Sequence, residues 1–441
     1  MLKRLSPGDG GLFSPPQPAK LALCMRIPSY RLCFVGLTLA VTGCSADGDP
    51  DNQGGNSGHG GMAGMAAGGG EAGSSAGGAA GNPGGSGGSG GSGGTTPTGG
   101  TGGTGGTSVP KVPFGVDKRV ANPTCIAPAR PTNAANDPFP KTIADTGCFD
   151  AVDVHKPRPA LIPFEVAAPL WSDAAGKRRW MAVPDGKTIT IEADGDFTFP
   201  IGTVLIKEFE LDGVLLETRF LIRHTDGDWA GYTYRWDDAG NVATLLGDVV
   251  DYRFVNDLEW QFPSRKNCLA CHSTSAGRSL GPEIGQLNSE MAYPGTGRAN
   301  QLATLDHIGM FKISPGDPKT LAAYPSPTSL AGTVAQRARA YLHSNCSHCH
   351  RPGGAMETAI DLRYLTPLAE TKACNIVPSK GQFGLPDSRI IVPGNLSDSI
   401  LRFRMSSTTQ NVRMPAIGTA LVDKLGLEAI DAWITDLKTC P

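Results

Sequence analysis

Two short windows of the sequence each set two cysteines three positions apart and place a histidine directly after the second. The window "CLACH" begins at residue 268, and the window "CSHCH" begins at residue 346. This C-x-x-C-H spacing is the attachment signature of c-type haem, in which the two thiols add to the vinyl groups. The adjacent histidine is then close enough to ligate the iron. The motifs predict two covalently bound haem c groups, attached through Cys268, Cys271, Cys346 and Cys349 and ligated by His272 and His350.

Two other kinds of site use paired cysteines. Zinc ribbons set their two pairs roughly 15–20 residues apart, far closer than the two windows here. A thioredoxin-like redox pair occurs near a βαβ pattern, which this sequence lacks. Haem attachment is therefore favoured, with a zinc site and a redox dithiol as the alternatives.

Methionine is a frequent second iron ligand in c-type cytochromes, where it raises the reduction potential. Met414 stands before a proline in "NVRMPAIG", an expected loop, and is predicted to ligate the iron opposite His350. Met405 is the competitor, but "LRFRM" has helical spacing and favours packing. The weak candidates for the distal iron ligand of the first haem are Met291, His307 and Met310. Each of them is more typical of a packing or surface residue.

Covalent haem attachment requires export, and the N-terminus has the features of an export signal. Met25 begins a segment with two arginines and an apolar run over 32–41, which is too short to span a bilayer. Residues 1–24 are polar and proline-rich, so Met25 is predicted to be the true start of a signal region that ends at 43. The small residues before Cys44 are similar to a bacterial lipobox, which implies lipidation of Cys44 and, by analogy, sorting to the outer membrane. An ordinary cleaved signal peptide is the alternative.

The segment 44–112 is predicted to be a disordered tether. It is dominated by Gly, Ser, Thr and Ala, as in "GGSGGSGGSGGTTPTGGTGGTGG", and has too few apolar residues to offset its ordering entropy. The formal net charge of the chain is −2, and no basic stripe occurs in it. Nucleic acid is therefore excluded as a partner, and the membrane is expected to be contacted only through the lipid anchor.

Four cysteines remain once the signal region, the lipidation site and the haem motifs are set aside. An even number of cysteines in an oxidising compartment indicates disulfides, and four cysteines allow three connectivities. The pairing within one region of the chain is favoured, which joins Cys125 to Cys148 and Cys374 to Cys440.

Residues 113–262 are predicted to form an antiparallel β-rich domain. Segments such as "TVLIKEFEL" and "VLLETRFLIRH" are rich in β-branched and apolar residues, and four Asp-Gly pairs between such segments indicate hairpin turns. The tryptophans of this domain are expected to be core or rim residues, namely Trp171, Trp180, Trp229, Trp236 and Trp260.

Two further regions complete an expected α+β fold. In the first haem segment, 263–330, "GRANQLATLDHIGMF" is predicted to be one helix with a buried stripe of Leu302, Leu305 and Ile308. Residues 331–441 are predicted to form an all-α domain with a helix over "VAQRARAYLHSNC". His343 in this helix and His348 after it are expected to be exposed residues without a role at the site. The last helix of the domain is expected to bury Val422, Leu425, Ala429, Trp433 and Leu437.

The C-terminal region resembles class I cytochrome c in "YLHSNCSHCHRPGG", "IIVPGNLSDSILRFRM" and "NVRMPAIG". From about Phe139 onward the chain is similar to a family of uncharacterised dihaem c-type cytochromes of Gram-negative bacteria. The stretches "QFPSRKNCLACHS", "ANQLATLDHIGMF" and "RARAYLHSNCSHCHRPGG" carry this match. The resemblance implies two covalent haems and electron transfer.

A weaker resemblance concerns the β-rich domain and the first motif. "FPIGTVLIKEFELDG", "GYTYRWDDAGN" and "CLACH" are similar to the β-sheet cytochromes c-prime-beta and their lysine-cross-linked relatives. In that family the haem lies on the sheet with an open distal face, and in the enzymes a lysine bonds to the macrocycle. Lys207 stands in the corresponding strand, so the resemblance implies a candidate catalytic role for it. The alternative, which is favoured, is that Lys207 is an ordinary solvent-facing strand lysine.

Three functions are compatible with these patterns. The favoured one is a membrane-anchored electron carrier between redox proteins of the periplasm, facing the periplasm or the cell surface. The second is a dihaem redox enzyme whose five-coordinate first haem acts on a small molecule such as peroxide, NO or hydroxylamine. In the third, the β-rich domain only docks a partner protein. No acid–base pair or nucleophile triad favouring hydrolysis is recognisable in the sequence.

Overall fold

The computed structural model describes residues 109–122, 124–125, 139–354, 356 and 358–441, together with an antiparallel pair of strands near the N-terminus, β1 (Cys24–Ile27) and β2 (Tyr30–Cys33). The chain divides into two units, Met1–Gly99 and Gly100–Pro441, each of which is described by itself. The predicted lipidation site Cys44 and nearly all of the predicted tether lie outside the described residues. Within the described part of the chain, every helix is too short or too polar to cross a bilayer.

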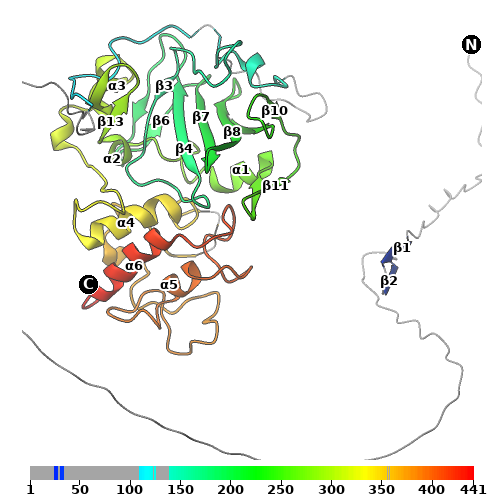
Figure 1. Ribbon diagram of the computed structural model, residues 1–441. Coiled ribbons are helices and arrows are strands. Elements are labelled where there is room, and N and C mark those ends of the chain that lie inside the picture. The colour runs from blue at the N-terminus through cyan, green and yellow to red at the C-terminus, as the bar shows by residue number, and fades with distance from the viewer. Residues whose placement is uncertain are drawn as a thin grey trace, which may run out of the picture. The chain divides into compact units, whose positions relative to one another are not determined.

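The second unit is built on a six-stranded antiparallel sheet, as the alternating strand patterns predict (Figure 1). Its strand order is β10-β9-β8-β7-β4-β3, so the four long strands lie next to one another at its centre. These strands supply the β-rich region expected between 113 and 262. The strands are β3 (Ile162–Pro163), β4 (Gly176–Ala182), β7 (Val204–Leu211), β8 (Val214–Arg223), β9 (Trp229–Trp236) and β10 (Ala243–Leu245).

The Asp-Gly pairs form turns where the sequence places them. Asp212 and Gly213 connect β7 to β8 with φ angles of 50° and 81°, which is the left-handed pair that a two-residue hairpin turn requires. Gly227, with φ of 86°, lies in the connection between β8 and β9. Because side chains alternate along a strand, these turns fix which residues share a face of the sheet.

Each face of the sheet is buried by a different segment. Residues from 139–161 cover the face that carries Trp180, Ile206 and Phe220. The opposite face carries Met181, Leu205 and Leu221, which pack in one cluster with Leu302, Leu305 and Phe311. Of the five tryptophans expected to be core or rim residues, four are buried, and the half-buried Trp171 is the exception.

The segment predicted as one helix over 297–309 is instead a strand followed by a helix. β14 (Gly297–Asn300) pairs with β13 (Glu290–Tyr293), and α3 (Gln301–His307) begins only after Asn300. The side chain of Asn300 accepts a hydrogen bond from the backbone N–H of Ala303, so it caps the helix at that point. The predicted stripe of Leu302, Leu305 and Ile308 is confirmed as buried. The other short elements of this region are η2 (Ala144–Thr146), β5 (Thr190–Ile191), β6 (Phe197–Thr198), β11 (Asp251–Val255), β12 (Leu258–Phe262), α1 (Arg265–Cys271), α2 (Ile284–Leu287) and η3 (Pro318–Thr320).

The C-terminal region is helical around its own core, as the sequence predicts. Gly426 lies where two helices cross, because a Cβ there would be 2.2 Å from the ring of Tyr341. The predicted stripe of the last helix is only partly right: Trp433 is buried, but Leu425 is 57% exposed. The helix begins at Lys424, and its buried residues are Gly426, Ile430, Trp433 and Ile434. The elements here are α4 (Val334–Asn345), η4 (Leu368–Glu370), α5 (Ile400–Met405) and α6 (Lys424–Asp436).

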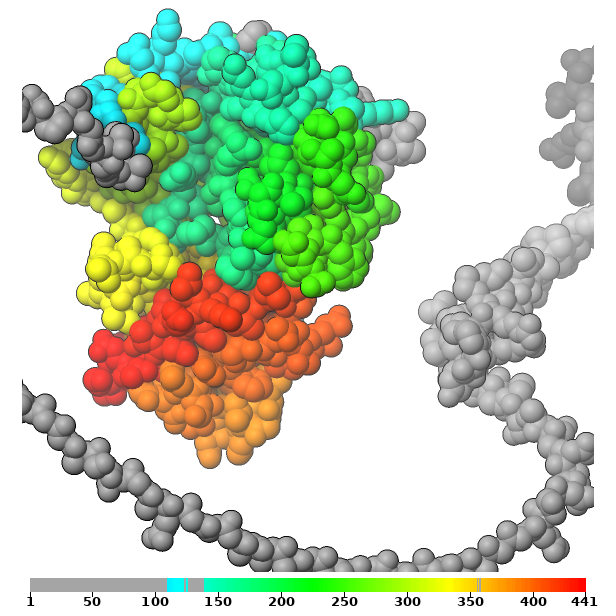
Figure 2. All heavy atoms as spheres, viewed as in Figure 1, coloured from blue at the N-terminus to red at the C-terminus, as the bar shows by residue number. Residues whose placement is uncertain are grey.

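The helical region packs directly on the sheet region (Figure 2). The backbone N–H of Trp171 donates to the side-chain oxygen of Asn345 at 2.7 Å. The carboxylate of Asp173 accepts hydrogen bonds from the backbone N–H groups of Ala420 and Leu421, at 2.9 and 2.7 Å. Partly buried hydrogen bonds of this kind, between a side chain and the backbone, hold the two regions against each other.

Two disulfides close loops in the second unit. They join Cys125 to Cys148 and Cys374 to Cys440, the pairing favoured by the sequence. The second bridge ties the last residues of the chain to the middle of the helical region.

We expect the Cys374–Cys440 bridge to stabilise the protein more than the other one. Its sequence separation is 66 residues against 23, and a longer loop loses more unfolded-state entropy when it is closed. Replacing Cys374 and Cys440 by serine should lower the free energy of unfolding by about 4 kcal/mol, and replacing Cys125 and Cys148 by about 3 kcal/mol. Urea unfolding of the oxidised proteins measures both values. Equal stability of the wild type and the Cys374/Cys440 variant would contradict the expectation.

Candidate functional site

The first C-x-x-C-H motif lies on helix α1 against the sheet. Ser264 caps the helix: its hydroxyl accepts from the N–H of Asn267, whose side chain in turn accepts from the N–H of Ser264. The cap starts the helix so that Cys268 and Cys271 fall one turn apart and His272 ends it. The element beneath α1 is the inner strand β9.

Gly231 of β9 makes the close approach of α1 possible. A Cβ built at Gly231 would lie 2.7 Å from the Cβ and 2.8 Å from the Sγ of Cys268, closer than any side chain can stand. Since Gly231 has no side chain, the thiol of Cys268 rests directly on the backbone of the sheet. The sheet therefore fixes the position of the first motif.

The ring of His272 is oriented by the loop that follows it. Its Nδ1 lies 2.5 Å from the carbonyl oxygen of Arg278, which can only accept, so Nδ1 carries the proton and donates. The guanidinium of Arg278 donates back to the carbonyl of His272 at 2.9 Å. Burial, followed by the charge of Lys207, lowers the pKa of His272 to about 3. A neutral ring with Nδ1 bonded to a carbonyl presents Nε2 as a metal ligand.

The second motif follows α4 directly. The helix is capped at Thr333 and ends at Asn345, with Cys346 as its C-cap. The backbone N–H of His350 donates to the carbonyl of Cys346 at 2.9 Å. The Nδ1 of His350 lies 3.2 Å from the hydroxyl of Thr358, and burial lowers the pKa of the ring. Both motifs therefore hold their histidine neutral, with Nδ1 bonded to a neighbouring oxygen.

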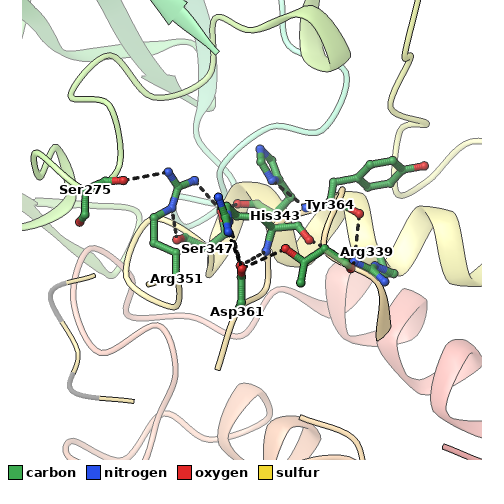
Figure 3. A network of polar contacts seen from close by, with 9 residues as sticks. Ser275, Arg339, His343, Ser347, Arg351, Asp361 and Tyr364 are labelled. Carbon is green, nitrogen blue, oxygen red and sulfur yellow. Dashed lines mark hydrogen bonds and ion pairs between the residues drawn. The ribbon is translucent and has the colours of Figure 1, made fainter. Parts of the chain in front are cut away.

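The two motifs, far apart in the sequence, meet in the structure. Arg351, which follows the second motif, is buried and donates to the carbonyl of Ser275 at 3.1 Å and to that of Ser347 at 2.9 Å (Figure 3). Ser275 lies three residues beyond the first motif. Burial, followed by the proximity of Cys349, raises the pKa of the Cys271 thiol to about 11. The two C-x-x-C-H motifs are thus neighbours in one folded unit.

His343 and His348, expected from the sequence to be exposed bystanders, are buried or nearly so, and that expectation is wrong. The backbone N–H of Tyr364 donates to Nδ1 of His343 at 3.0 Å, so Nε2 carries the proton and donates to Glu283 at 2.7 Å. His348 is 8% exposed. His343 lies on the face of α4 that packs against the segment around Glu283, a contact that local sequence spacing does not reveal.

Asp196 lies close to this network, and its charge should make stability depend on pH. Burial, followed by the negative charges of Glu283 and Asp194, raises the pKa of Asp196 to about 6. The folded protein therefore binds this proton more tightly than the unfolded chain does, and stability falls as the pH rises from about 4 to about 6. We expect D196N to be about 1–2 kcal/mol more stable than the wild type above pH 6, with no difference near pH 4.

Urea unfolding across this pH range measures the effect of D196N. D257N is the matched control, since Asp257 is exposed and adopts a left-handed backbone, with φ of 65°, that asparagine also tolerates. A gain in stability from D196N that is the same at pH 4 and pH 7 would rule out the titration of Asp196 as its cause.

Met414 and His350 of the second motif both lie near Arg404. The backbone N–H of Met414 donates to the carbonyl of Arg404 at 3.0 Å, and burial, followed by the charge of Arg404, lowers the pKa of His350. The half-buried side chain of Met414 lines a hollow with Trp171 and Tyr341. Its competitor Met405 is buried in the helical core, in agreement with the prediction that it packs.

The three weak distal candidates for the first haem pack elsewhere. Met310 is fully buried in the cluster that covers the sheet, and Met291 packs with Tyr293 and Ala299. The ring of His307 stacks on Phe114 at 3.8 Å, and its Nε2 bonds the carbonyl of Asp117 at 2.9 Å. All three are thus engaged in packing or hydrogen bonding.

Lys207 is not the solvent-facing strand lysine that was favoured. It is half-buried on β7, directly opposite Arg179 of β4 and Arg219 of β8. Burial, followed by the charges of these arginines, lowers its pKa well below the usual range. Its charge also lowers the pKa of His272, which places Lys207 beside the first motif.

Several residues of this site escaped the sequence analysis. Arg278 and Thr358 orient the two histidines through contacts that carry no motif, and Arg351 joins the two motifs. One signal was present: in "GKRRW", Lys177 and Arg179 stand two apart, so in a strand they share one face.

Comparisons with protein-family models, with curated proteins and with solved structures find no match to this chain. Among the residues that the structure describes, no three His, Cys, Asp or Glu side chains converge so as to hold a metal ion. Each motif contains two thiols separated by one helical turn or a short loop. Each also contains one neutral histidine whose Nδ1 is hydrogen-bonded to a neighbouring oxygen. This donor set fits covalent haem.

Proposed function

We propose that the protein is a dihaem c-type cytochrome that carries electrons between redox partners in the periplasm. The observation that carries this proposal is the meeting of the two C-x-x-C-H motifs, joined by the hydrogen bond from Arg351 to the carbonyl of Ser275. Two attachment sites built side by side in one unit support passage of electrons from one site to the other. When bound, haem supplies a one-electron iron couple at each site.

The side chains of the motifs have distinct tasks in this proposal. Their cysteine thiols would form the thioether bonds to haem, and Nε2 of His272 and of His350 would ligate its iron, with each ring held by its Nδ1 partner. The thioether of Met414 would supply a further ligand to the iron held by His350. Both histidines are half-buried, which limits the access of water to the two sites.

The helical region is proposed to be a class I cytochrome c domain. Three features support this assignment: α4 and α6 cross at Tyr341 and Gly426, the second motif follows α4, and Met414 lies in a loop. The chain is proposed to belong to the uncharacterised dihaem cytochromes that it resembles. Export, lipidation at Cys44 and location at the outer membrane complete the proposal.

A second candidate function is a dihaem redox enzyme, with the first site as its reactive centre. The specific observation in its favour is that Met291, His307 and Met310 all pack elsewhere, while Lys207 lies beside His272. The first iron would then have an open face for a small molecule, and the second site would supply or accept its electrons.

Spectroscopy of protein matured in a haem-attaching periplasm tests both functions. A pyridine haemochrome assay should give two haems per chain, and fewer than two would overturn the proposal. Electron paramagnetic resonance and carbon monoxide binding then separate the two candidates. Two low-spin haems inert to carbon monoxide would establish the carrier, whereas one high-spin haem that binds carbon monoxide would favour the enzyme.

A further inference from the structure

Three cationic side chains form a row across the centre of the sheet. Arg179 on β4 pairs with Lys207 on β7, and Lys207 pairs with Arg219 on β8. Residues directly opposite each other on neighbouring strands project from the same face, so the three side chains lie side by side. Lys177, two residues before Arg179, shares this face.

The row lies on the face that carries the first motif. Arg219 pairs with Thr233 of β9, and Gly231, which touches Cys268, is two residues from Thr233 and so shares its face. The charges of Arg219 and Lys207 both act on the Cys271 thiol. The cations are therefore next to Cys268 and Cys271, the residues to which a haem would attach.

The protein neutralises only part of this positive charge. Arg219 forms a bidentate ion pair with the buried carboxylate of Glu217. Within the described residues, Arg179 and Lys207 have no ion pair. Arg179 is 9% exposed, and the carboxylate that acts on it belongs to the exposed Glu165.

The ring of Phe209 provides weak compensation for the cations. The ammonium of Lys207 lies 5.7 Å from the centre of the ring, that of Lys177 lies 5.8 Å away, and the guanidinium of Arg219 lies 4.3 Å away. Cation–π contacts contribute about 0.5–2 kcal/mol, less than the several kcal/mol that desolvating a charge costs. Burial accordingly lowers the pKa of Arg179 to about 10 and that of Lys177 to about 7.

We propose that Arg179 and Lys207 form an anion-binding site on the floor of the first haem site, which takes a carboxylate or a small oxyanion. Burial removes the water that would hydrate an unpaired cation, and a bound anion compensates for this loss of hydration. A guanidinium beside an ammonium can donate several charge-assisted hydrogen bonds to one carboxylate. The anion has two possible sources, the propionates of a haem attached at Cys268 and Cys271 or a free oxyanion. The first source rests on the proposed function, and the second does not.

The test uses the matured full-length protein and its variants R179Q, K207Q and K266Q. K266Q is the matched control, because Lys266 is an exposed lysine on α1 beside the same motif. The wild-type haem count is measured first. A count below two overturns the proposed function without deciding the anion site, which the formate titration then tests alone.

Sodium formate is titrated into the protein while sodium chloride keeps the ionic strength constant. The visible spectrum and the melting temperature are recorded at each formate concentration. The reduction potentials of both haems are measured separately. If a free anion binds, formate should raise the melting temperature by an amount that grows with the logarithm of its concentration above the dissociation constant, with affinity about tenfold weaker or more in R179Q and K207Q but unchanged in K266Q. If propionates occupy the site, formate has no effect, and in R179Q and K207Q one reduction step shifts to lower potential while the other stays. No formate effect with unchanged potentials, or an equal change in K266Q, would overturn the proposal. K207Q decides the matter alone if R179Q fails to fold, since Lys207 is only half-buried.

Discussion

Replacing Gly231 by valine is expected to prevent attachment of the first haem while leaving the second one in place. The Cβ alone would stand 2.8 Å from Sγ of Cys268, and the two methyl groups of valine add to the overlap. Strand β9 cannot retreat, because it is paired along its length with β8, so helix α1 must be displaced. A displaced Cys268 no longer lies where the haem vinyl group is presented. The haem count by pyridine haemochrome should fall from two to one per chain.

Gly247→Val is the matched control, because a Cβ at Gly247 meets no atom within 4 Å. It adds the same side chain to the same region and should keep both haems. The mass of tryptic peptides shows which motif carries haem, so that loss from the first motif is separated from general misfolding. Retention of both haems in G231V, or equal loss in G247V, would mean that the contact between Gly231 and Cys268 does not control attachment.

The strands were predictable because the features that specify them are local. Asp212 and Gly213 adopt the two left-handed conformations that a tight hairpin needs, and the strands on either side alternate correctly. The predicted helix over 297–309 failed for an equally local reason. Asn300 is a strong helix cap, and the pairing of the preceding residues with β13 outweighs their helical spacing.

The sequence of the two motifs indicates what they could bind, but it does not indicate that they lie close together. The spacing of Cys268, Cys271 and His272 predicts haem attachment without any knowledge of the fold. The bond between Arg351 and Ser275, by contrast, arises from the packing of α4 against the segment around Glu283. Contacts between segments so far apart in sequence leave no periodic signal, and His343 was misjudged for the same reason.

The role of Lys207 depended on which face of the sheet receives the first motif. Alternation places Lys207 and Phe209 on one face and Glu208 on the other, which the sequence does show. It does not show that α1 crosses β9 at Gly231, since a glycine in a strand indicates a close approach without naming the neighbour. The cationic row therefore became visible only from the register of β4, β7 and β8.

In the proposed cytochrome Met414 ligates the iron held by His350, and replacing Met414 by leucine is expected to remove that ligand. Leucine has nearly the same volume, and Met414 is only half-buried, so the fold should lose less than about 1.5 kcal/mol. Since methionine opposite histidine raises the potential of a haem, one of the two reduction steps should fall by on the order of a few tenths of a volt. The same haem should gain carbon monoxide binding, which a spectrum of the reduced protein detects.

Met405→Leu is the control that decides between the two methionines. Met405 is buried in the helical core, so its replacement should alter the free energy of unfolding and leave both reduction steps and carbon monoxide binding unchanged. If M405L, and not M414L, lowers the potential and opens the iron, the ligand belongs to α5 and not to the loop. If neither variant does so, the second haem takes its distal ligand from another residue, and the low-spin methionine-ligated carrier is the wrong description of this domain.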